Sequence, residues 1–432
     1  MIKTQRSNMK SGKMPSRFVT LVPGLLLATL LAMPDALAAG PSPDEPIFSL
    51  SGFGTLGAVH SSERNADYTN TIFQLKGAGF TEPWSLAVDS RVGLQINANL
   101  SRQWSGVLQI ISEQRYDGSF RPAIEWANLT YQATPDLRMR VGRIALPGTL
   151  SSDYRKVGYA IPWIRPPRDV YSLTPVTNND GIDLRYRSHF GETTNTLQAY
   201  YGQKDLKTTY QNGEPLRGRE AIGVTDTVEM DAVTLRASYQ QGRLTMPASK
   251  PFFDQLRQFG AAGVALADQY DFENKPYRVL SFGVNYDPGR WFLTSEWERI
   301  QTHSWSGDGT GWFVGGGMRL GHFTPYLTYS RARLDSPSSD PGLPTAGLPL
   351  PYALVALRAN AVLNSLLGNF IPNDRTIALG TRWDFASNAA LKFQYEHISV
   401  GNGSNGTFRR PQPDFKTGSQ ANLISVALDV VF

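Results

Sequence analysis

The sequence predicts an all-β protein, a transmembrane antiparallel up-and-down β-barrel of sixteen strands. Three observations predict it: segments in which polar and apolar residues alternate, connections that alternate between short turns and long loops, and an apolar strand at the end of the chain. The composition agrees, with 40 Gly, 28 Pro, 21 Phe, 18 Tyr and 9 Trp, because turns use glycine and proline and strands favour aromatic residues. A mean hydropathy of −0.29 excludes a bundle of membrane helices, whereas a barrel strand is only half apolar.

The first 38 residues have the pattern of a signal peptide that is cleaved. Their residues include five basic side chains and one acid, Asp35, which accounts for most of the chain's formal net charge of +5. The apolar run 18–32 is short for a membrane span, which needs about 20 residues, and Ala36-Leu37-Ala38 has the form of a cleavage site. An uncleaved signal anchor is the alternative. We expect an exported protein with a short polar lead at 39–46 and no nucleic-acid binding.

The chain contains no cysteine. In an exported protein this excludes disulfides, thiolate metal sites and cysteine nucleophiles. No motif for a cofactor or a metal replaces them.

The barrel domain is expected over residues 47–432. Its first strand, 47–60, contains Gly52-Phe53-Gly54-Thr55-Leu56-Gly57, which matches the GxGxxG pattern of a dinucleotide-binding loop. That interpretation requires a helix directly afterwards, and the residues after His60 have no helical period. We therefore interpret these glycines as strand residues at a bend or a close backbone approach.

Residues 86–100 show the clearest strand pattern. Leu94 and Ile96 lie among the apolar residues of one face, and Arg91, Gln95 and Asn97 lie on the other. A slip of one residue would put Arg91 against lipid at a cost of roughly 2–4 kcal/mol near the bilayer centre. The apolar face is therefore expected to point outward.

The remaining strands follow at regular intervals, and they bring the total to sixteen. They are expected at 104–116, 121–132, 137–144, 181–189, 193–202, 226–240, 243–248, 275–287, 291–302, 311–320, 322–333, 375–386, 389–400 and 420–432. Short turns, such as 101–103 and 387–388, alternate with connections that are mostly long, such as 147–180 and 334–374. This is the layout of an outer-membrane barrel, with short periplasmic turns and long extracellular loops.

Two of the long loops contain helix-like segments, at 252–270 and 352–367. They are expected either to cover the mouth of the barrel or to fold inward and narrow it. The first alternative is preferred.

The last strand, 421–432, has one apolar face and ends on an aromatic residue, Phe432. An exposed apolar edge invites aggregation in a soluble protein, but a closed barrel has no edge. We expect this strand to pair antiparallel with 47–60 and to close the barrel.

Strand alternation places many charged groups on the inner face, among them Arg236, Glu298, Lys392 and Glu396. So many charges in a dry core would carry a severe desolvation cost, and a barrel of sixteen strands is wide enough for an aqueous channel. The long connection after the fifth strand, 147–180, is rich in Pro, Trp, Tyr and Arg and has no regular period. The stretch that contains it, 141–183, is the predicted centre of function.

At this point the sequence resembles a known family, the general porins of Gram-negative bacteria. The resemblance rests on the signal peptide, the glycine-rich first strand, Val141-Gly142-Arg143 before the third loop, and the terminal Phe432, and it covers about residues 47–432. It implies a homotrimer of 16-stranded barrels in the cell outer membrane, in contact with its lipids, whose third extracellular loop folds into the lumen. It also implies passive diffusion of small hydrophilic solutes and ions, and that Phe432 is a signal for the outer-membrane insertion machinery.

The charges around the third loop suggest the site. The residues expected at the pore constriction are Arg138, Arg140, Arg143, Asp153, Arg155, Lys156, Arg165, Arg168, Asp169, Asp183, Arg185 and Arg187. From 147 to 179 the loop carries two acids against four bases, which departs from the acidic third loop of the family. We therefore expect a weak preference for anions, although each arginine could equally anchor the loop.

Two other classes of function stay open. Aromatic residues such as Tyr154 and Trp163 could guide a sugar, phosphate or organic acid through a substrate-specific channel, or they could pack the loop against the wall. An outer-membrane enzyme is disfavoured because there is no GxSxG or HExxH motif and the five histidines are scattered. Glu296 and Glu298 are paired acids on one inner face; such a pair could be catalytic, but in a channel wall it more often affects ion flow.

Overall fold

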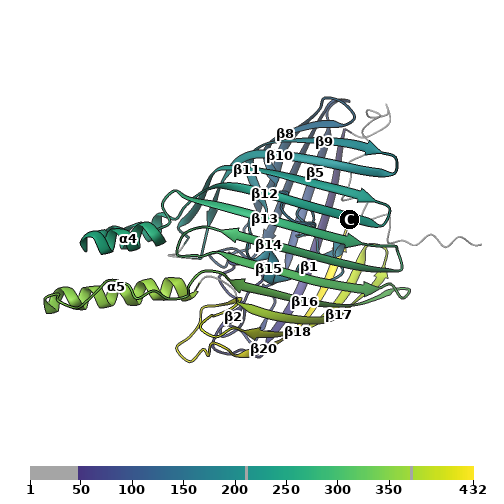
Figure 1. Ribbon diagram of the computed structural model, residues 1–432. Helices are drawn as coiled ribbons and strands as arrows, with labels where there is room; N and C mark the ends of the chain where they lie inside the picture. Colours follow the sequence, from purple (N-terminus) through teal and green to yellow (C-terminus); the bar gives the residue numbers. More distant parts are fainter. Residues whose placement is uncertain (1–46, 210–212, 370–372) are drawn as a thin grey trace, which may run out of the picture. The chain divides into compact units, whose positions relative to one another are not determined.

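The computed structural model describes residues 47–209, 213–369 and 373–432, and these form a closed barrel of sixteen long antiparallel strands (Figure 1). The predicted fold class is confirmed. The long strands are β1 (Phe48–Ser61), β5 (Arg91–Asn99), β6 (Trp104–Glu113), β7 (Ala123–Gln132), β8 (Leu137–Ala145), β9 (Asn178–Phe190), β10 (Thr193–Lys207), β11 (Pro215–Met230), β12 (Val233–Thr245), β13 (Lys275–Tyr286), β14 (Trp291–Gln301), β15 (Gly309–Met318), β16 (Phe323–Leu334), β17 (Asp374–Ala386), β18 (Ala389–Val400) and β20 (Gln420–Val431). The predicted signal peptide and polar lead, residues 1–46, lie outside the described residues.

The first and last strands close the barrel. Leu56 of β1 is paired with Leu428 of β20, and the other edge of β1 pairs with β5. The Phe432 carbonyl accepts a backbone hydrogen bond from Gly52, and the Phe432 N–H donates one back to Gly52. The expected antiparallel pairing of the two chain ends is confirmed.

The two faces of each strand differ as the alternation predicts. Leu94 and Ile96 of β5 are exposed on the outer surface, whereas Gln95 forms hydrogen bonds with Gln109 and Asn97. On β20, Ile424 is exposed outside and Ser425 is buried inside. The outer surface is therefore apolar and the inner surface polar, as a barrel in lipid requires.

Two strand assignments from the sequence are wrong. The expected strand 226–240 is the end of β11, a two-residue turn at Asp231 and Ala232, and the start of β12. The residues between the expected strands 226–240 and 243–248, Gln241 and Gly242, were expected to form a turn but lie inside β12, where the glycine leaves room for the Tyr277 ring. The expected strand 86–100 begins only at Arg91, because the preceding segment bends inward; the short strand β4 (Trp84–Ser85) pairs there with β1.

A small second sheet lies near the end of the barrel from which the long loops emerge. It consists of β2 (Asp67–Tyr68), β3 (Ala78–Gly79) and β19 (Phe408–Arg409), contributed by the first and last long loops. The side chains of its residues Tyr68 and Phe408 are buried against residues of β1, β18 and β20. The segment from β1 to β5 is thereby held against the C-terminal strands.

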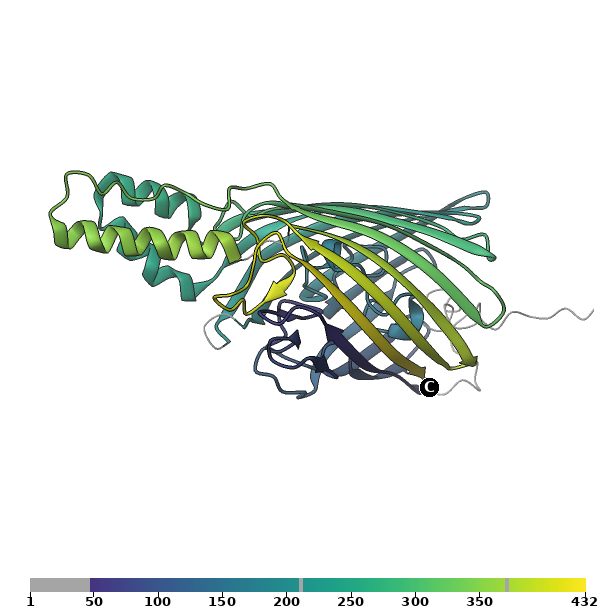
Figure 2. The same ribbon diagram turned by 90° about the horizontal axis from the view of Figure 1, so that it is seen from below.

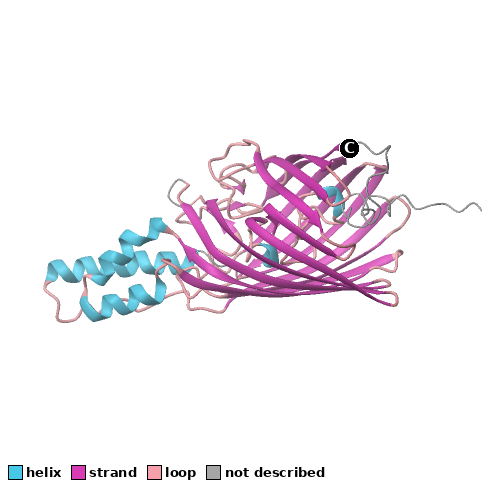
Figure 3. Ribbon diagram, turned by 90° about the horizontal axis from the view of Figure 1, so that it is seen from above, coloured by secondary structure: helices cyan, strands magenta, loops and turns pink. Residues whose placement is uncertain are grey.

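Three helices pack together at the same end of the barrel (Figures 2 and 3). They are α3 (Lys250–Arg257), α4 (Gly260–Tyr270) and α5 (Leu350–Asn369), which confirms that both helix-like segments are helical. Phe253, Ala356 and Leu363 lie in their shared core. Residues 350–368 are long and apolar enough to cross a membrane by length and composition alone, with only 17% of them buried. The helices do not fold into the barrel.

Candidate functional site

The long connection between β8 and β9, residues 146–177, lies inside the barrel and touches the wall at several places. It contains a short 3-10 helix, η2 (Gly158–Ala160), and one helical turn, α2 (Arg168–Tyr171). We call this segment the lumen loop. The side chains that hold it come from strands on opposite sides of the barrel, so the segment crosses the interior.

The N-terminal part of the lumen loop is held by β11 to β14. The Thr225 hydroxyl donates a hydrogen bond to the Pro147 carbonyl at 2.5 Å, and the hydroxyls of Ser238 and Ser281 both donate to the carbonyl of Gly148. The Leu150 N–H donates to a carboxylate oxygen of Glu296 at 2.9 Å. These contacts satisfy backbone groups that would otherwise be buried without partners.

An apolar cluster fixes the middle of the lumen loop on β14 to β16. The ring of Trp163 lies edge-on to three wall rings, those of Phe292, Phe313 and Tyr326, at centroid distances of 5.9, 6.0 and 6.0 Å. Gly315 lies beside the indole, and a side chain there would press against it. Trp163 and the other lumen-loop aromatic residues in this cluster therefore pack against the barrel wall.

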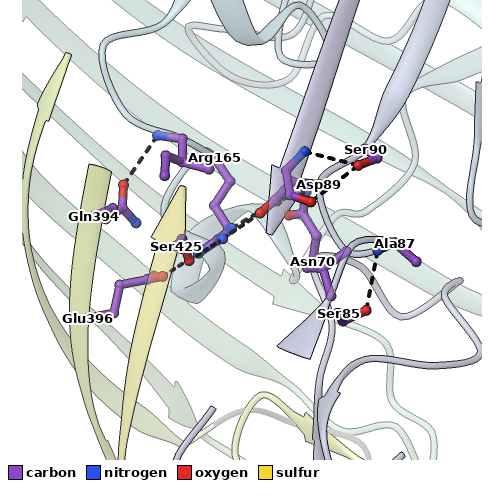
Figure 4. A network of polar contacts seen from close by, with 12 residues as sticks. Asn70, Ser85, Ala87, Asp89, Ser90, Arg165, Gln394, Glu396 and Ser425 are labelled. Atoms are coloured by element: carbon purple, nitrogen blue, oxygen red, sulfur yellow. Dashed lines mark hydrogen bonds and ion pairs between the residues drawn. The ribbon is translucent and has the colours of Figure 1, made fainter. Parts of the chain in front are cut away.

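Arg165 is the centre of a buried ion-pair network (Figure 4). Its Nε and Nη2 donate to the two carboxylate oxygens of Asp89 at 3.0 and 2.6 Å, and its Nη1 donates to Glu396. The Ser425 hydroxyl accepts from Nη2 at 2.8 Å. With 3% of Arg165 exposed, the guanidinium ties the lumen loop to β18, β20 and the segment before β5.

Lys392 of β18 is a second buried cation that binds the same part of the loop. Its Nζ donates to the carbonyls of Gly158, Ile161 and Trp163 at 2.6, 2.7 and 3.0 Å, and pairs with the Asp429 carboxylate at 2.9 Å. The Lys392 side chain is fully buried. An ammonium group has three donors, so these four oxygens satisfy it completely.

The opposite side of the lumen loop is held by acids of β6 and β7. Lys156 Nζ donates to Glu113 at 2.6 Å and to Glu125 at 2.9 Å. Next to it, Val157 packs against Phe53 of β1. The loop thus makes charged contacts with both sides of the barrel.

The helical turn α2 contributes three buried residues, the charged Arg168 and Asp169 and the apolar Val170. Arg168 lies over the ring of Tyr68 at 5.2 Å, and Asp169 accepts a hydrogen bond from Ser330. Burial raises the pKa of the Asp169 carboxyl, and the nearby Asp374 raises it further. Both charged residues therefore lie in the packed part of the structure.

A basic arc remains partly accessible on the wall opposite this packing. It consists of Arg138 and Arg140 of β8, Arg185 of β9 and Arg236 of β12. Arg140 is paired with Asp183 in a bidentate contact, and Arg185 lies 3.9 Å from Asp153 of the lumen loop, whose side chain is 42% exposed. In the described part of the chain Arg138 has no ion pair. Four arginines thus face two aspartates, an excess of two positive charges.

The sequence-predicted residues therefore divide into groups. Arg165, Arg168, Asp169 and Asp183 are buried, and Lys156 is paired with two acids. Arg155 donates to the loop carbonyls of Thr174 and Pro175. Arg143 pairs with Asp180 near the ends of β8 and β9, and Arg187 lies farther along β9 with a partner of its own. The accessible ones are gathered around Arg138, Arg185 and Asp153.

Sequence reasoning missed two acids that hold the loop, Asp89 and Asp429. Each is 1% exposed or less. A signal for Asp429 existed, because it is the only charged residue in the last predicted strand, 420–432, and lies on its inner face. The pattern of the expected strand 86–100 puts Asp89 on the polar face with Arg91, but it gives no signal that this carboxylate pairs with Arg165.

Comparisons with known proteins identify the fold. No protein-family model and no curated protein sequence matches the chain. Among solved structures, the anion-selective porin from Comamonas acidovorans is 11% identical, with a TM-score of 0.51 over 89% of this chain and 99% of that one. The outer membrane channel DcaP of Acinetobacter baumannii and Salmonella typhi OmpF, the latter in complex with daunomycin, are each 12% identical, with TM-scores of 0.52 over 89% of this chain and 97% of theirs. The chain has the sixteen-stranded barrel fold of the Gram-negative outer-membrane porins.

Proposed function

We propose that this protein is a channel of the outer membrane for the passive diffusion of small hydrophilic solutes and ions. The single observation that carries the proposal is the inner face of the barrel, where charged and hydrogen-bonding side chains surround a loop that crosses the interior. The fold shared with outer-membrane porins supports it. The direct test is single-channel conductance of the purified protein in a planar bilayer, and the absence of any conductance from folded barrel would refute it.

We further propose a weak preference for anions. The support is the basic arc, whose four arginines outnumber the two nearby aspartates and include the partly accessible Arg138 and Arg185. Charges in a narrow passage with low-dielectric walls change the local ion concentration. Arg165 is a poor probe of this effect because it is buried between two acids.

The selectivity test therefore uses the accessible arginines. In a salt gradient, Arg138→Glu and Arg185→Glu together should move the reversal potential toward cation selectivity, because four charge units change at the basic arc. Arg102→Glu, on an exposed turn outside the lumen, is the matched control. A wild-type channel with clear cation selectivity would contradict the proposal.

The homotrimer is also a proposal. The outer face of β1 carries the small residues Gly54 and Ala58 on either side of the exposed Leu56, an apolar surface on which another barrel could pack. Cross-linking of the purified protein tests it, with a monomer as the contrary result.

A substrate-specific channel is the alternative, and an enzyme is not proposed. Addition of sugars, phosphate or organic acids to the bilayer experiment distinguishes a specific channel, since a bound solute would block the current at low concentration.

A further inference from the structure

Six exposed arginines project from the outer surface of the barrel, on the strands between β12 and β17. They are Arg243, Arg278, Arg299, Arg331, Arg333 and Arg375. We call them the arginine belt. Each shares the face of exposed apolar residues on its own strand, as Arg278 does with Leu280 and Phe282, and Arg375 with Ile377 and Leu379. They therefore point away from the lumen.

Strand register makes the belt continuous. Arg331 is directly opposite Arg375, and Arg299 is opposite Thr310, which is in turn opposite Arg333. Arg278 lies diagonal to Arg299, which faces Leu280. Arg243 faces Pro276 and is therefore diagonal to Arg278 as well. Such opposite and diagonal positions are within side-chain reach.

Most of this positive charge is uncompensated. Arg243 pairs with Glu220 at 3.3 Å and Arg333 with Asp335 at 3.6 Å. The side chains of the other four belt arginines have no ion pair or hydrogen bond within residues 47–209, 213–369 and 373–432. Like charges directly opposite each other destabilise a sheet. An arrangement such as Arg331 facing Arg375 thus favours an external anionic partner.

The position of the belt along the barrel axis indicates where that partner lies. On β13 the outward residues from the short turn upward are Tyr286, Val284, Phe282 and Leu280, and the next is Arg278. The belt thus begins where the apolar band ends, on the side of the long loops. Arginine on a lipid face costs about 2–4 kcal/mol at the bilayer midplane but about 0–1 near the interface. The belt therefore matches the headgroup level.

Beyond β17 the same level of the barrel is not arginine-rich, whereas on the other side Arg219 of β11 lies directly opposite Arg243 and pairs with Asp205 at 2.5 Å. His397 of β18 and Asn422 of β20 are opposite each other there and form a hydrogen bond of 2.8 Å. His60 of β1 lies against the Trp84 ring. The charge is thus confined to one side of the barrel and is not a general feature of its rim.

We propose that the arginine belt binds lipids of the outer leaflet whose headgroups carry phosphate groups. A guanidinium binds a phosphate through two parallel hydrogen bonds, and outward side chains at headgroup level reach such groups without entering hydrocarbon. From β12 to β17 the belt spans five strand spacings of about 4.8 Å each, which is room for more than one headgroup. The inference rests on the proposed membrane location but not on conductance.

The test measures lipid binding by the full chain in uncharged detergent, with diphosphorylated lipid A as the probe. A variant with Arg278, Arg299, Arg331 and Arg375 changed to Gln should bind it several hundredfold more weakly, since each basic residue near an anionic surface contributes about fivefold. The matched control changes four exposed arginines outside the belt, Arg102, Arg121, Arg290 and Arg358, to Gln. Its affinity should equal that of the wild type.

Three results would overturn the proposal. They are equal affinities of the belt and control variants, equally tight wild-type binding of lipid A without phosphates, and displacement of lipid A by millimolar inorganic phosphate. The measurement with dephosphorylated lipid A uses only the wild-type protein. It therefore tests the proposal even if the belt variant fails to fold. A protein that conducts no ions but binds lipid A through the belt would refute the proposed channel and leave this inference intact.

Discussion

Two buried cations, Arg165 and Lys392, explain how a loop stays inside a water-accessible barrel. Arg165 belongs to the lumen loop and pairs with two carboxylates outside it, whereas Lys392 belongs to the wall and binds loop carbonyls; both are almost completely buried. The sequence predicted Arg165 at the pore constriction, because the position of a residue in the loop indicates a region of the barrel. It does not indicate which residues Arg165 contacts. Its partners, Asp89 and Glu396, lie 76 and 231 residues away in the chain. No local pattern could reveal that three-way contact.

Removal of Lys392 tests this anchoring. Lys392→Met should destabilise the barrel by about 3–5 kcal/mol, because a buried ion pair broken on one side leaves an uncompensated charge. The Asp429 carboxylate and three loop carbonyls would lose their donor. Urea unfolding followed by tryptophan fluorescence measures the change. Lys392→Met with Asp429→Asn should recover part of the loss; no recovery would mean that the pair itself contributes nothing.

At the scale of the strand, alternation is a reliable guide to faces and a poor guide to ends. It gave the correct inward and outward sides on β5 and β20, since a one-residue slip would put charge in lipid. It failed between β11 and β12 because a turn of two residues barely interrupts the period. Asp231 adopts a positive φ of 47° in that turn. Gly242, which was expected to be a turn residue, lies in a strand and makes room for the Tyr277 ring.

Neighbouring residues of β5 test the face assignment. Leu94→Arg should destabilise the barrel by about 2–4 kcal/mol, because it puts a charge on the lipid face near the middle of the strand. Gln95→Arg, one residue away, should change the unfolding free energy little, because Gln95 lies on the polar inner face. Unfolding in lipid vesicles compares the two. Equal effects would contradict the orientation of the strand.

At the scale of the whole molecule, the sixteen strands and their closure followed from the sequence, but the path of the lumen loop did not. The count survived two wrong assignments because one moved a turn and the other moved the start of a strand, and neither added nor removed a strand. The path of the loop depends on contacts with strands on both sides of the barrel. Two of these contacts are the Trp163 cluster on β14 to β16 and the pairing of Lys156 with Glu113 and Glu125. Such contacts exist only once the barrel is closed.

Phe432 lies where the last strand closes the barrel on the first, so it is the residue with which to test assembly. Its backbone completes two hydrogen bonds with Gly52 of β1, and its ring lies over that glycine while remaining 65% exposed on the outer surface. Deletion of Phe432 should reduce the amount of heat-modifiable, folded protein in the outer membrane severalfold, because the closing pair and the predicted assembly signal are lost together. The barrels that do insert should conduct normally, since this residue does not face the lumen. Phe385→Ala, which removes an outward aromatic ring of similar exposure from β17, is the control for general loss of an aromatic residue at the barrel surface. Unchanged assembly without Phe432, or an equal loss in the Phe385 variant, would show that the terminal residue has no special role.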